Sequence, residues 1–146
     1  MSKDGIAIQV KNLSKSYKDG DTMHKVLDGL ELEIKKGEFV AIMGPSGCGK
    51  TTLLYILAGL CRPDSGYVQI LDLVLTQATD KELITLRQKH IGFIFQRFNL
   101  IPTLTVLDNL RLMAYIAGVD MESPEAIASQ FDLPPRLYNN YPHQLS

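Results

Sequence analysis

The hydrophobic pattern at the start of the chain predicts β-strands. Apolar and polar residues alternate over 6–13 and again over 30–34, as expected of strands with one buried face, and turn-forming residues separate the two runs at 18–21. Residues 39–43 are continuously apolar, which is typical of a strand covered on both faces. We therefore predict an antiparallel pair of strands followed by a central strand.

The pattern beyond residue 43 alternates between helix and strand. A glycine-rich loop follows the predicted central strand and precedes a helical pattern, so strand, loop and helix occur in the order of a βαβ unit. The later part of the chain is predominantly helical, and its tail is irregular because it contains several prolines. The predicted elements are a helix over 50–60 closed by Gly59, a strand over 67–71, a charged helix over 80–90 with Asp80 as N-cap, a strand over 91–95, an amphipathic helix over 105–117 and a shorter helix over 124–131.

Composition and charge exclude several classes of protein. Apolar residues make up 45% of the 146 residues and charged residues 21%, which is ordinary globular usage. The net charge of -1 provides no basic surface for nucleic acid, so any anion must be bound locally. No apolar run approaches the ~20 residues of a membrane-spanning helix, and the amino terminus lacks the pattern of a secretion signal. We expect a cytoplasmic chain with no nucleic-acid partner.

A phosphate-binding loop is the strongest chemical signal. Its glycines allow the backbone to approach an anion, and its N–H groups and the following helix terminus attract a polyphosphate. Lys50 supplies a charge for the β and γ phosphates, and the Thr51 hydroxyl is placed to bind Mg²⁺. The alternative is a glycine turn without a ligand. The residues that fit the pattern G-x-x-x-x-G-K-[ST] and its flank are Gly44, Pro45, Ser46, Gly47, Cys48, Gly49, Lys50, Thr51 and Thr52.

The cysteines and histidines do not form a metal-binding pattern. Cys48 and Cys61 lie outside any CxxC, and His24, His90 and His143 have no partners at metal-ligand spacing, so we expect neither a disulfide nor a catalytic histidine. Cys48 has two interpretations. A thiol at a helix N-terminus can have a lowered pKa and act as a redox-sensitive switch, or any small side chain serves at this position.

The residues around the loop resemble the nucleotide-binding domain of ABC transporters. The shared stretches read AIMGPSGCGKTTLL, LAGL, PDSG, RQKHIGFIFQ and NLIPTLTV. Their sequences are closest to the branch of the family that serves lipoprotein release and macrolide-type export. The resemblance runs from about Val10 to Ser146. It implies an α/β P-loop NTPase (RecA-like) core with an N-terminal antiparallel β subdomain over 1–100, and the start of a helical subdomain over 101–146.

The resemblance also implies roles for single residues and for partners. Lys50 and Gln96 would be catalytic, Gln96 would contact Mg²⁺ and the attacking water, and Tyr17 would stack on the adenine of ATP. Without the resemblance, Tyr17 is an ordinary half-buried strand-end tyrosine, Gln96 is an unremarkable polar residue and the apolar stripe of 105–117 is ordinary core packing. The implied partners are a transmembrane permease subunit and a second nucleotide-binding subunit, with the chain peripheral to the inner membrane.

The sequence departs from the family pattern at its end. Residues 141–146 read YPHQLS, which resembles the approach to the family signature Leu-Ser-Gly-Gly-Gln, and no Asp-Glu pair of the family's catalytic strand occurs in the 146 residues. We therefore expect a chain truncated within the signature. The sequence predicts an ATPase subunit that hydrolyses ATP to drive transport when complete and dimerised, or alternatively a module that binds ATP without hydrolysing it.

Two further expectations follow from these motifs. A small P-loop kinase is disfavoured, because no acceptor-binding lid or arginine cluster is visible. The strand that bears the family's Asp-Glu pair would lie beside residues 39–43. Without it, the predicted central strand has an unpaired edge, and we expect marginal stability or self-association.

Overall fold

The computed structural model describes residues 5–118 and 123–145. The chain forms two compact units, which divide between Arg87 and Gln88. Within the described ranges, no helix has both the length and the apolar character needed to span a membrane.

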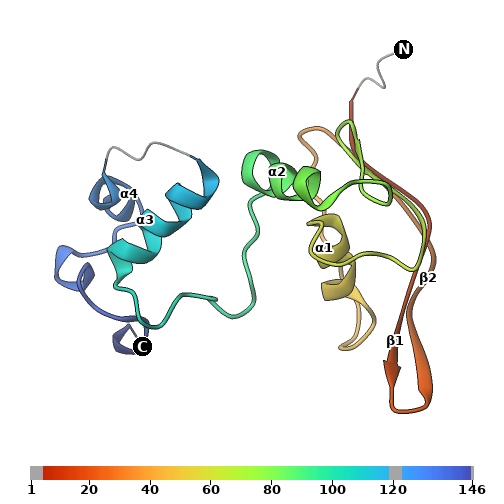
Figure 1. Ribbon diagram of the computed structural model, residues 1–146, viewed down its shortest axis with the longest axis horizontal. Helices are drawn as coiled ribbons and strands as arrows, with labels where there is room; N and C mark the ends of the chain where they lie inside the picture. Colours follow the sequence, from red (N-terminus) through yellow and green to blue (C-terminus); the bar gives the residue numbers. More distant parts are fainter. Residues whose placement is uncertain (1–4, 119–122, 146) are drawn as a thin grey trace. The chain divides into compact units, whose positions relative to one another are not determined.

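A long hairpin forms most of the sheet in the first unit (Figure 1). Strand β1 (Ile6–Asp19) pairs antiparallel with β2 (Thr22–Lys35), and Asp19 lies opposite Thr22 so that only Gly20 and Asp21 form the turn. Gly20 has a φ of +57°, a conformation that glycine adopts without steric cost. The predicted antiparallel opening is confirmed.

Two shorter strands complete this sheet. Strand β3 (Ser65–Ile70) pairs antiparallel with β1, with Val10 opposite Val68, and β4 (Leu73–Val74) pairs antiparallel with β3. The strand order is therefore β2-β1-β3-β4. The strand predicted over 67–71 is confirmed as β3.

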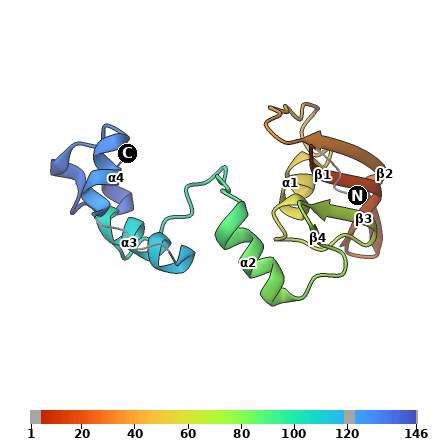
Figure 2. The same ribbon diagram turned by 90° about the horizontal axis from the view of Figure 1, so that it is seen from above.

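Helix α1 (Lys50–Leu57) lies beside the sheet (Figure 2). Its carboxyl end forms a Schellman motif, in which the Gly59 N–H donates to Ile56 O at 2.9 Å and the Leu60 N–H donates to Tyr55 O at 2.8 Å. The helix thus ends before Gly59 rather than at Leu60. The apolar side chains buried in this part of the unit come from the helix and from three strands: Leu53, Ile56, Leu57, Val10, Leu13, Leu27, Val68 and Ile70.

Helix α2 (Asp80–His90) begins with a capping box. The Thr79 Oγ1 accepts from the Glu82 N–H at 3.3 Å, and the Glu82 carboxylate accepts from the Thr79 N–H at 2.8 Å. The hydrogen bonds that the Glu82 carboxylate accepts from the Thr79 N–H and from the Thr79 hydroxyl lower the pKa of Glu82. The prediction of Asp80 as N-cap is wrong by one residue, because the Thr79 hydroxyl makes the cap and Asp80 pairs with Arg62 at 2.9 Å.

The second unit contains two helices followed by short turns. Helix α3 (Val106–Ala117) has Thr105 as N-cap, and α4 (Pro124–Gln130) has Ser123 as N-cap. The predictions of helices over 105–117 and 124–131 are therefore confirmed to within a residue at each end. The irregular tail contains two 3₁₀ turns that each begin at a proline, η1 (Pro135–Leu137) and η2 (Pro142–Gln144).

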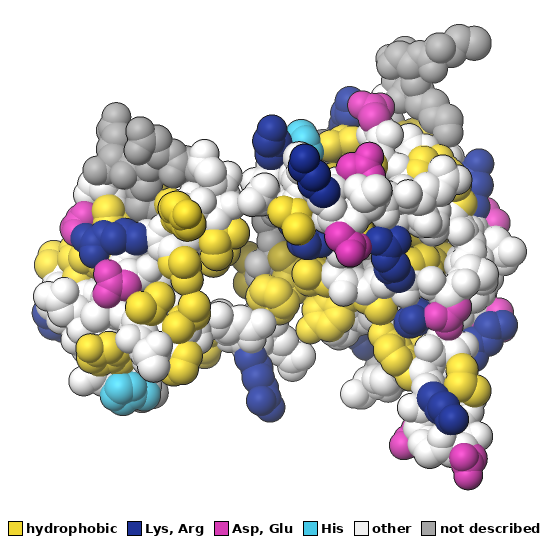
Figure 3. Space-filling view, viewed as in Figure 1, with side chains coloured by type: hydrophobic (Ala, Val, Ile, Leu, Met, Phe, Trp, Pro, Cys, Tyr) yellow, Lys and Arg dark blue, Asp and Glu magenta, His cyan; other side chains and the backbone are white. Residues whose placement is uncertain are grey.

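Two predicted strands do not form. Residues 39–43 and 91–95 have no strand structure, and Phe39 and Ile94 are 96% and 97% exposed. A continuous apolar run is suited to a strand that is covered on both faces of its sheet. The strand forms only when neighbouring strands supply its hydrogen bonds, and neither run joins the hairpin sheet. Yellow side chains are correspondingly visible on the surface of both units in Figure 3.

Candidate functional site

The glycine loop lies directly before α1 and packs against strand β2. Gly49 precedes the first helical residue with a φ of +94°. A Cβ at this position would lie 2.5 Å from the carbonyl oxygen of Val26 and 2.9 Å from Cδ2 of Leu27. Only glycine allows this approach. The contact with β2 therefore fixes where the loop ends and the helix begins.

The rest of the loop exposes backbone to solvent. Residues 44–48 are exposed, and Gly47 takes a φ of +81° with no heavy atom within 4 Å of the position that a Cβ would occupy. The loop leads into the first turn of α1, whose N–H groups have no acceptor within the helix. An exposed glycine loop at the positive end of a helix dipole is suited to bind a phosphate group.

Lys50 folds back over this loop. Its Nζ donates to Gly44 O at 2.9 Å and to Pro45 O at 2.6 Å, and it lies 3.6 Å from the Cys48 Sγ. The ammonium group therefore lies against the loop backbone, where it adds a full positive charge to the helix dipole. When a phosphate enters, the Lys50 ammonium would replace one of these neutral carbonyl acceptors by a charged phosphate oxygen, which accepts the stronger hydrogen bond.

Thr51 and Thr52 differ in their surroundings. Thr51 is exposed in the first turn of α1, so its hydroxyl is accessible to a metal ion, whereas Thr52 is half-buried. Mg²⁺ binds oxygen ligands and commonly retains waters alongside one or two protein groups and substrate phosphates. The oxygen donor at Thr51, beside a loop suited to phosphate, fits that ion.

Tyr17 belongs to the same unit and lies near the end of β1. The residue is 43% exposed, and its hydroxyl lies 3.7 Å from the Cys61 Sγ. Partial burial of the phenol and its contact with Cys61 raise the pKa of Tyr17, while a hydrogen bond with Thr52 opposes this shift. The contact with Thr52 brings the tyrosine to the helix that follows the glycine loop.

Gln96 is placed in the second unit. It is exposed in an irregular stretch, and the strand predicted to end beside it does not form. Tyr17 and the loop of residues 44–52 thus belong to the first unit, where the tyrosine contacts Thr52, and Gln96 belongs to the other unit. Both cysteines are free thiols, with Cys48 exposed and Cys61 half-buried.

Sequence reasoning missed the buried Asn109 of α3. Its Oδ1 accepts from the Ile101 N–H at 2.8 Å, and its Nδ2 donates to the carbonyl oxygens of Ile101, Leu104 and Thr105 at 3.2, 3.1 and 2.9 Å. Asn109 thus holds the segment before α3 in place. The sequence signal was an asparagine among the apolar positions of an amphipathic helix. A polar side chain at a buried position is hydrogen bonded, so this residue could have been expected to bind nearby backbone.

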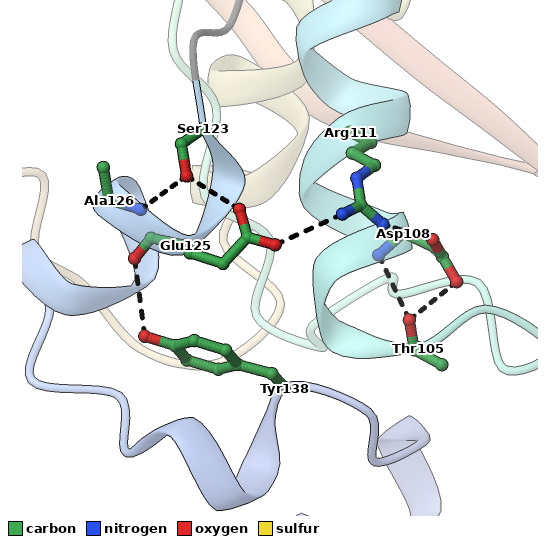
Figure 4. Close-up of polar contacts among 7 residues, drawn as sticks. All are labelled: Thr105, Asp108, Arg111, Ser123, Glu125, Ala126 and Tyr138. Carbon is green, nitrogen blue, oxygen red and sulfur yellow. Dashed lines mark hydrogen bonds and ion pairs between the residues drawn. The ribbon is translucent and has the colours of Figure 1, made fainter.

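A polar network connects α3 and α4 (Figure 4). Arg111 pairs with Asp108 at 3.1 Å and with Glu125 at 3.2 Å, and the Ser123 hydroxyl donates to Glu125 at 2.7 Å. Hydrogen bonds from Thr105 and Arg111 lower the pKa of Asp108, and the hydrogen bond from Ser123 lowers that of Glu125. These groups satisfy one another, so the network has a structural role. Over 5–118 and 123–145, no three metal-ligating side chains cluster.

Comparisons with known proteins found one matching family and several similar proteins. The profile of the family described as ABC transporter matches residues 27–146. The ABC transporter ATP-binding protein MJ0796 of Methanocaldococcus jannaschii is 41% identical over 146 residues, covering 95% of this chain and 62% of that protein. The lipoprotein-releasing system ATP-binding protein LolD of Bacteroides thetaiotaomicron is 47% identical over 112 residues, covering 77% and 50%. The bacitracin export ATP-binding protein BceA of Halalkalibacterium halodurans is 37% identical over 142 residues, covering 95% and 56%.

A solved structure of MJ0796 is similar to this chain. The dimeric cassette, in a post-hydrolysis state bound to ADP and Pi, matches with a TM-score of 0.86 and 39% identity, covering 95% of this chain and 63% of the MJ0796 chain. The chain spans between 44% and 63% of the length of these and the other curated relatives that it matches.

Proposed function

Because the chain belongs to the ABC transporter ATP-binding family, we propose that its loop of residues 44–52 binds the phosphates of Mg-ATP. Its fold is the ABC cassette form of the P-loop NTPase fold, with an antiparallel β subdomain and helices, and it is partial relative to MJ0796. The resemblance to this family that the sequence predicts, including the closeness to the lipoprotein-release branch, is confirmed.

The contact between the loop and β2 is the observation that carries the proposal. Gly49 has no room for a Cβ, so the loop and the first turn of α1 are held in one orientation before any ligand arrives. A preorganised set of N–H donors loses little entropy on binding. Lys50 would then contact the β and γ phosphates, and Thr51 would hold Mg²⁺. The metal would neutralise charge on the phosphates.

The remaining site residues are proposed from the resemblance. Tyr17 would stack on adenine, which its exposed ring and its contact with Thr52 of α1 support. Gln96 would contact Mg²⁺ and the attacking water. Cys48 would act as one of the small loop residues around the phosphates. Because its thiol is exposed, alkylation with and without ATP would test the alternative interpretation as a redox switch.

Transport is the proposed role of the complete subunit. The MJ0796 cassette is dimeric with ADP and Pi, so we propose that the complete protein pairs with a second nucleotide-binding subunit, hydrolyses ATP and drives transport through a permease partner, peripheral to the inner membrane. The 146 residues contain no Asp-Glu pair to support Mg²⁺ and activate water. The alternative for this polypeptide is therefore ATP binding without hydrolysis.

A binding experiment tests the proposal. Calorimetry with Mg-ATP should detect binding to the 146-residue chain, and Lys50→Ala should weaken it by at least about tenfold, because a charged hydrogen bond to phosphate contributes about 1.5–3 kcal/mol. Lys81→Ala removes an exposed lysine of α2 and is the matched control. Phosphate release measured on the same samples separates ATP hydrolysis from binding alone. Equal affinities of wild type and Lys50→Ala would refute the proposed site.

A further inference from the structure

Asp64 connects the loop after α1 to the end of strand β1. One carboxylate oxygen, Oδ1, accepts from the Lys15 Nζ at 2.7 Å, and the other, Oδ2, accepts from the Ser16 N–H at 2.7 Å. The Asp64 N–H in turn donates to Ser14 O at 3.0 Å. Three contacts therefore hold Asp64 against three consecutive residues of β1.

Strand β3 begins directly after this loop and lies close against β1. Gly66 of β3 has a φ of +104°, and a Cβ there would lie 2.5 Å from Asn12 O and 2.7 Å from the Leu13 Cα. The close approach of β3 to β1 therefore fixes the end of the loop that follows Asp64. The Lys15 side chain, which is only 16% exposed, is shielded by this arrangement, and its hydrogen bond with Asp64 raises its pKa, so it stays charged.

Lys15 in turn contacts the aromatic ring of Tyr17. Its Nζ lies over the ring, 5.4 Å from the centroid, within the range of a cation–π interaction. The hydroxyl end of the same ring meets the Cys61 thiol at 3.7 Å. One face and one end of the ring are thus held by protein groups, while 43% of the residue remains exposed.

We propose that Asp64 and Lys15 are positioning residues that hold the Tyr17 ring so that its open face receives the nucleotide base. This inference rests on the proposed function, since it assigns to the Tyr17 site the groups that orient it. Aromatic rings stack on bases through their faces, and a ring already fixed in orientation loses less conformational freedom on binding. Neither Asp64 nor Lys15 needs to touch the nucleotide.

The test compares two ligands that share the phosphates. Mg-ATP contains a base and Mg-tripolyphosphate does not, so only the first can report on Tyr17. We expect the 146-residue chain to bind Mg-ATP more tightly than Mg-tripolyphosphate. Lys15→Met and Asp64→Asn should each lose about three- to tenfold in ATP affinity, because a ring that is no longer held keeps only part of its stacking energy with the base. Tripolyphosphate affinity should stay unchanged within about twofold. Lys11→Met, an exposed lysine on the same strand, is the matched control.

Two further variants show whether Lys15 acts through the ring. Lys15→Arg keeps a cation over Tyr17 and should restore most of the ATP affinity. Lys15→Met should have no added effect in a Tyr17→Ala background, because residues that act through one another are not additive. Full additivity in this double variant would overturn the proposal, as would unchanged ATP affinity in both single variants.

The remaining outcomes are also decisive. Equal losses for both ligands would show that Lys15 and Asp64 merely support the local fold, which overturns the positioning role. Wild-type chain that binds both ligands equally would show that Tyr17 does not stack on the base, yet it would leave the phosphate site intact. Wild-type chain that binds neither ligand would refute the proposed function itself and this inference with it.

Discussion

Replacing Gly49 with alanine tests the view that close packing against β2 fixes the phosphate-binding loop. The added Cβ would lie 2.5 Å from Val26 O, closer than such atoms approach in folded proteins, and the φ of +94° would be strained for any residue other than glycine. Overpacking costs about 1–3 kcal/mol and a strained φ costs about 1–3 kcal/mol. We expect Gly49→Ala to destabilise the chain by about 2–6 kcal/mol, a large fraction of the stability of a typical domain.

Gly47→Ala is the matched control, because it shares the strain but not the clash. Gly47 has a φ of +81° and nothing within 4 Å of the Cβ position, so its substitution should cost only the backbone term. Urea unfolding followed by circular dichroism measures both variants at an unchanged m-value. The excess loss in Gly49→Ala isolates the clash with β2. If the two variants lose the same stability, the loop is not held by this contact and the reasoning is refuted.

Two further predictions concern pH and self-association. The Lys15 ammonium and the Ser16 N–H hold the pKa of Asp64 below the value of 3.8 expected without these partners, so its contribution to stability is present above that pH and is lost as the pH falls through the lowered folded-state pKa. The drop in urea midpoint between pH 5 and pH 3 should therefore be smaller in Asp64→Asn than in wild type, and an identical drop would contradict the ion pair. Phe39 is 96% exposed, so Phe39→Asp should leave the unfolding midpoint nearly unchanged while reducing self-association in sedimentation velocity experiments. Wild-type chain that sediments as a monomer at all concentrations would show that this surface does not associate.

Local patterns predicted the elements whose contacts lie nearby in the sequence. The hairpin, the glycine loop and α1 follow one another within the first 60 residues. The helix ends before Gly59 because the N–H groups of Gly59 and Leu60 donate to carbonyl oxygens three and five positions earlier. Helix α3 is equally local, because Thr105 caps it and the apolar spacing defines its buried side. Such features depend on interactions between near neighbours, which sequence patterns describe directly.

Features that depend on distant partners could not be predicted in the same way. The apolar runs at 39–43 and 91–95 are suited to buried strands, but a run does not show whether neighbouring strands are present to pair with it. Neither run forms a strand. The position of Asp64 against Lys15 depends on a contact between a loop and a strand 49 residues apart in the sequence. Neither residue has a pattern around it that would have revealed that pairing.

The phosphate loop is held by a different part of the fold from the one that the sequence first indicates. The apolar run at 39–43 leads into the loop and would conventionally be its support, yet it forms no strand here. The loop instead rests on β2 through Gly49, and β2 belongs to the antiparallel sheet that does form. Lys50 also donates to carbonyl oxygens of the loop itself, so the groups proposed to bind phosphate lie within one short segment of the chain. Phosphate binding should therefore depend on the hairpin and α1, and a chain with net charge -1 can bind a polyphosphate without any basic surface.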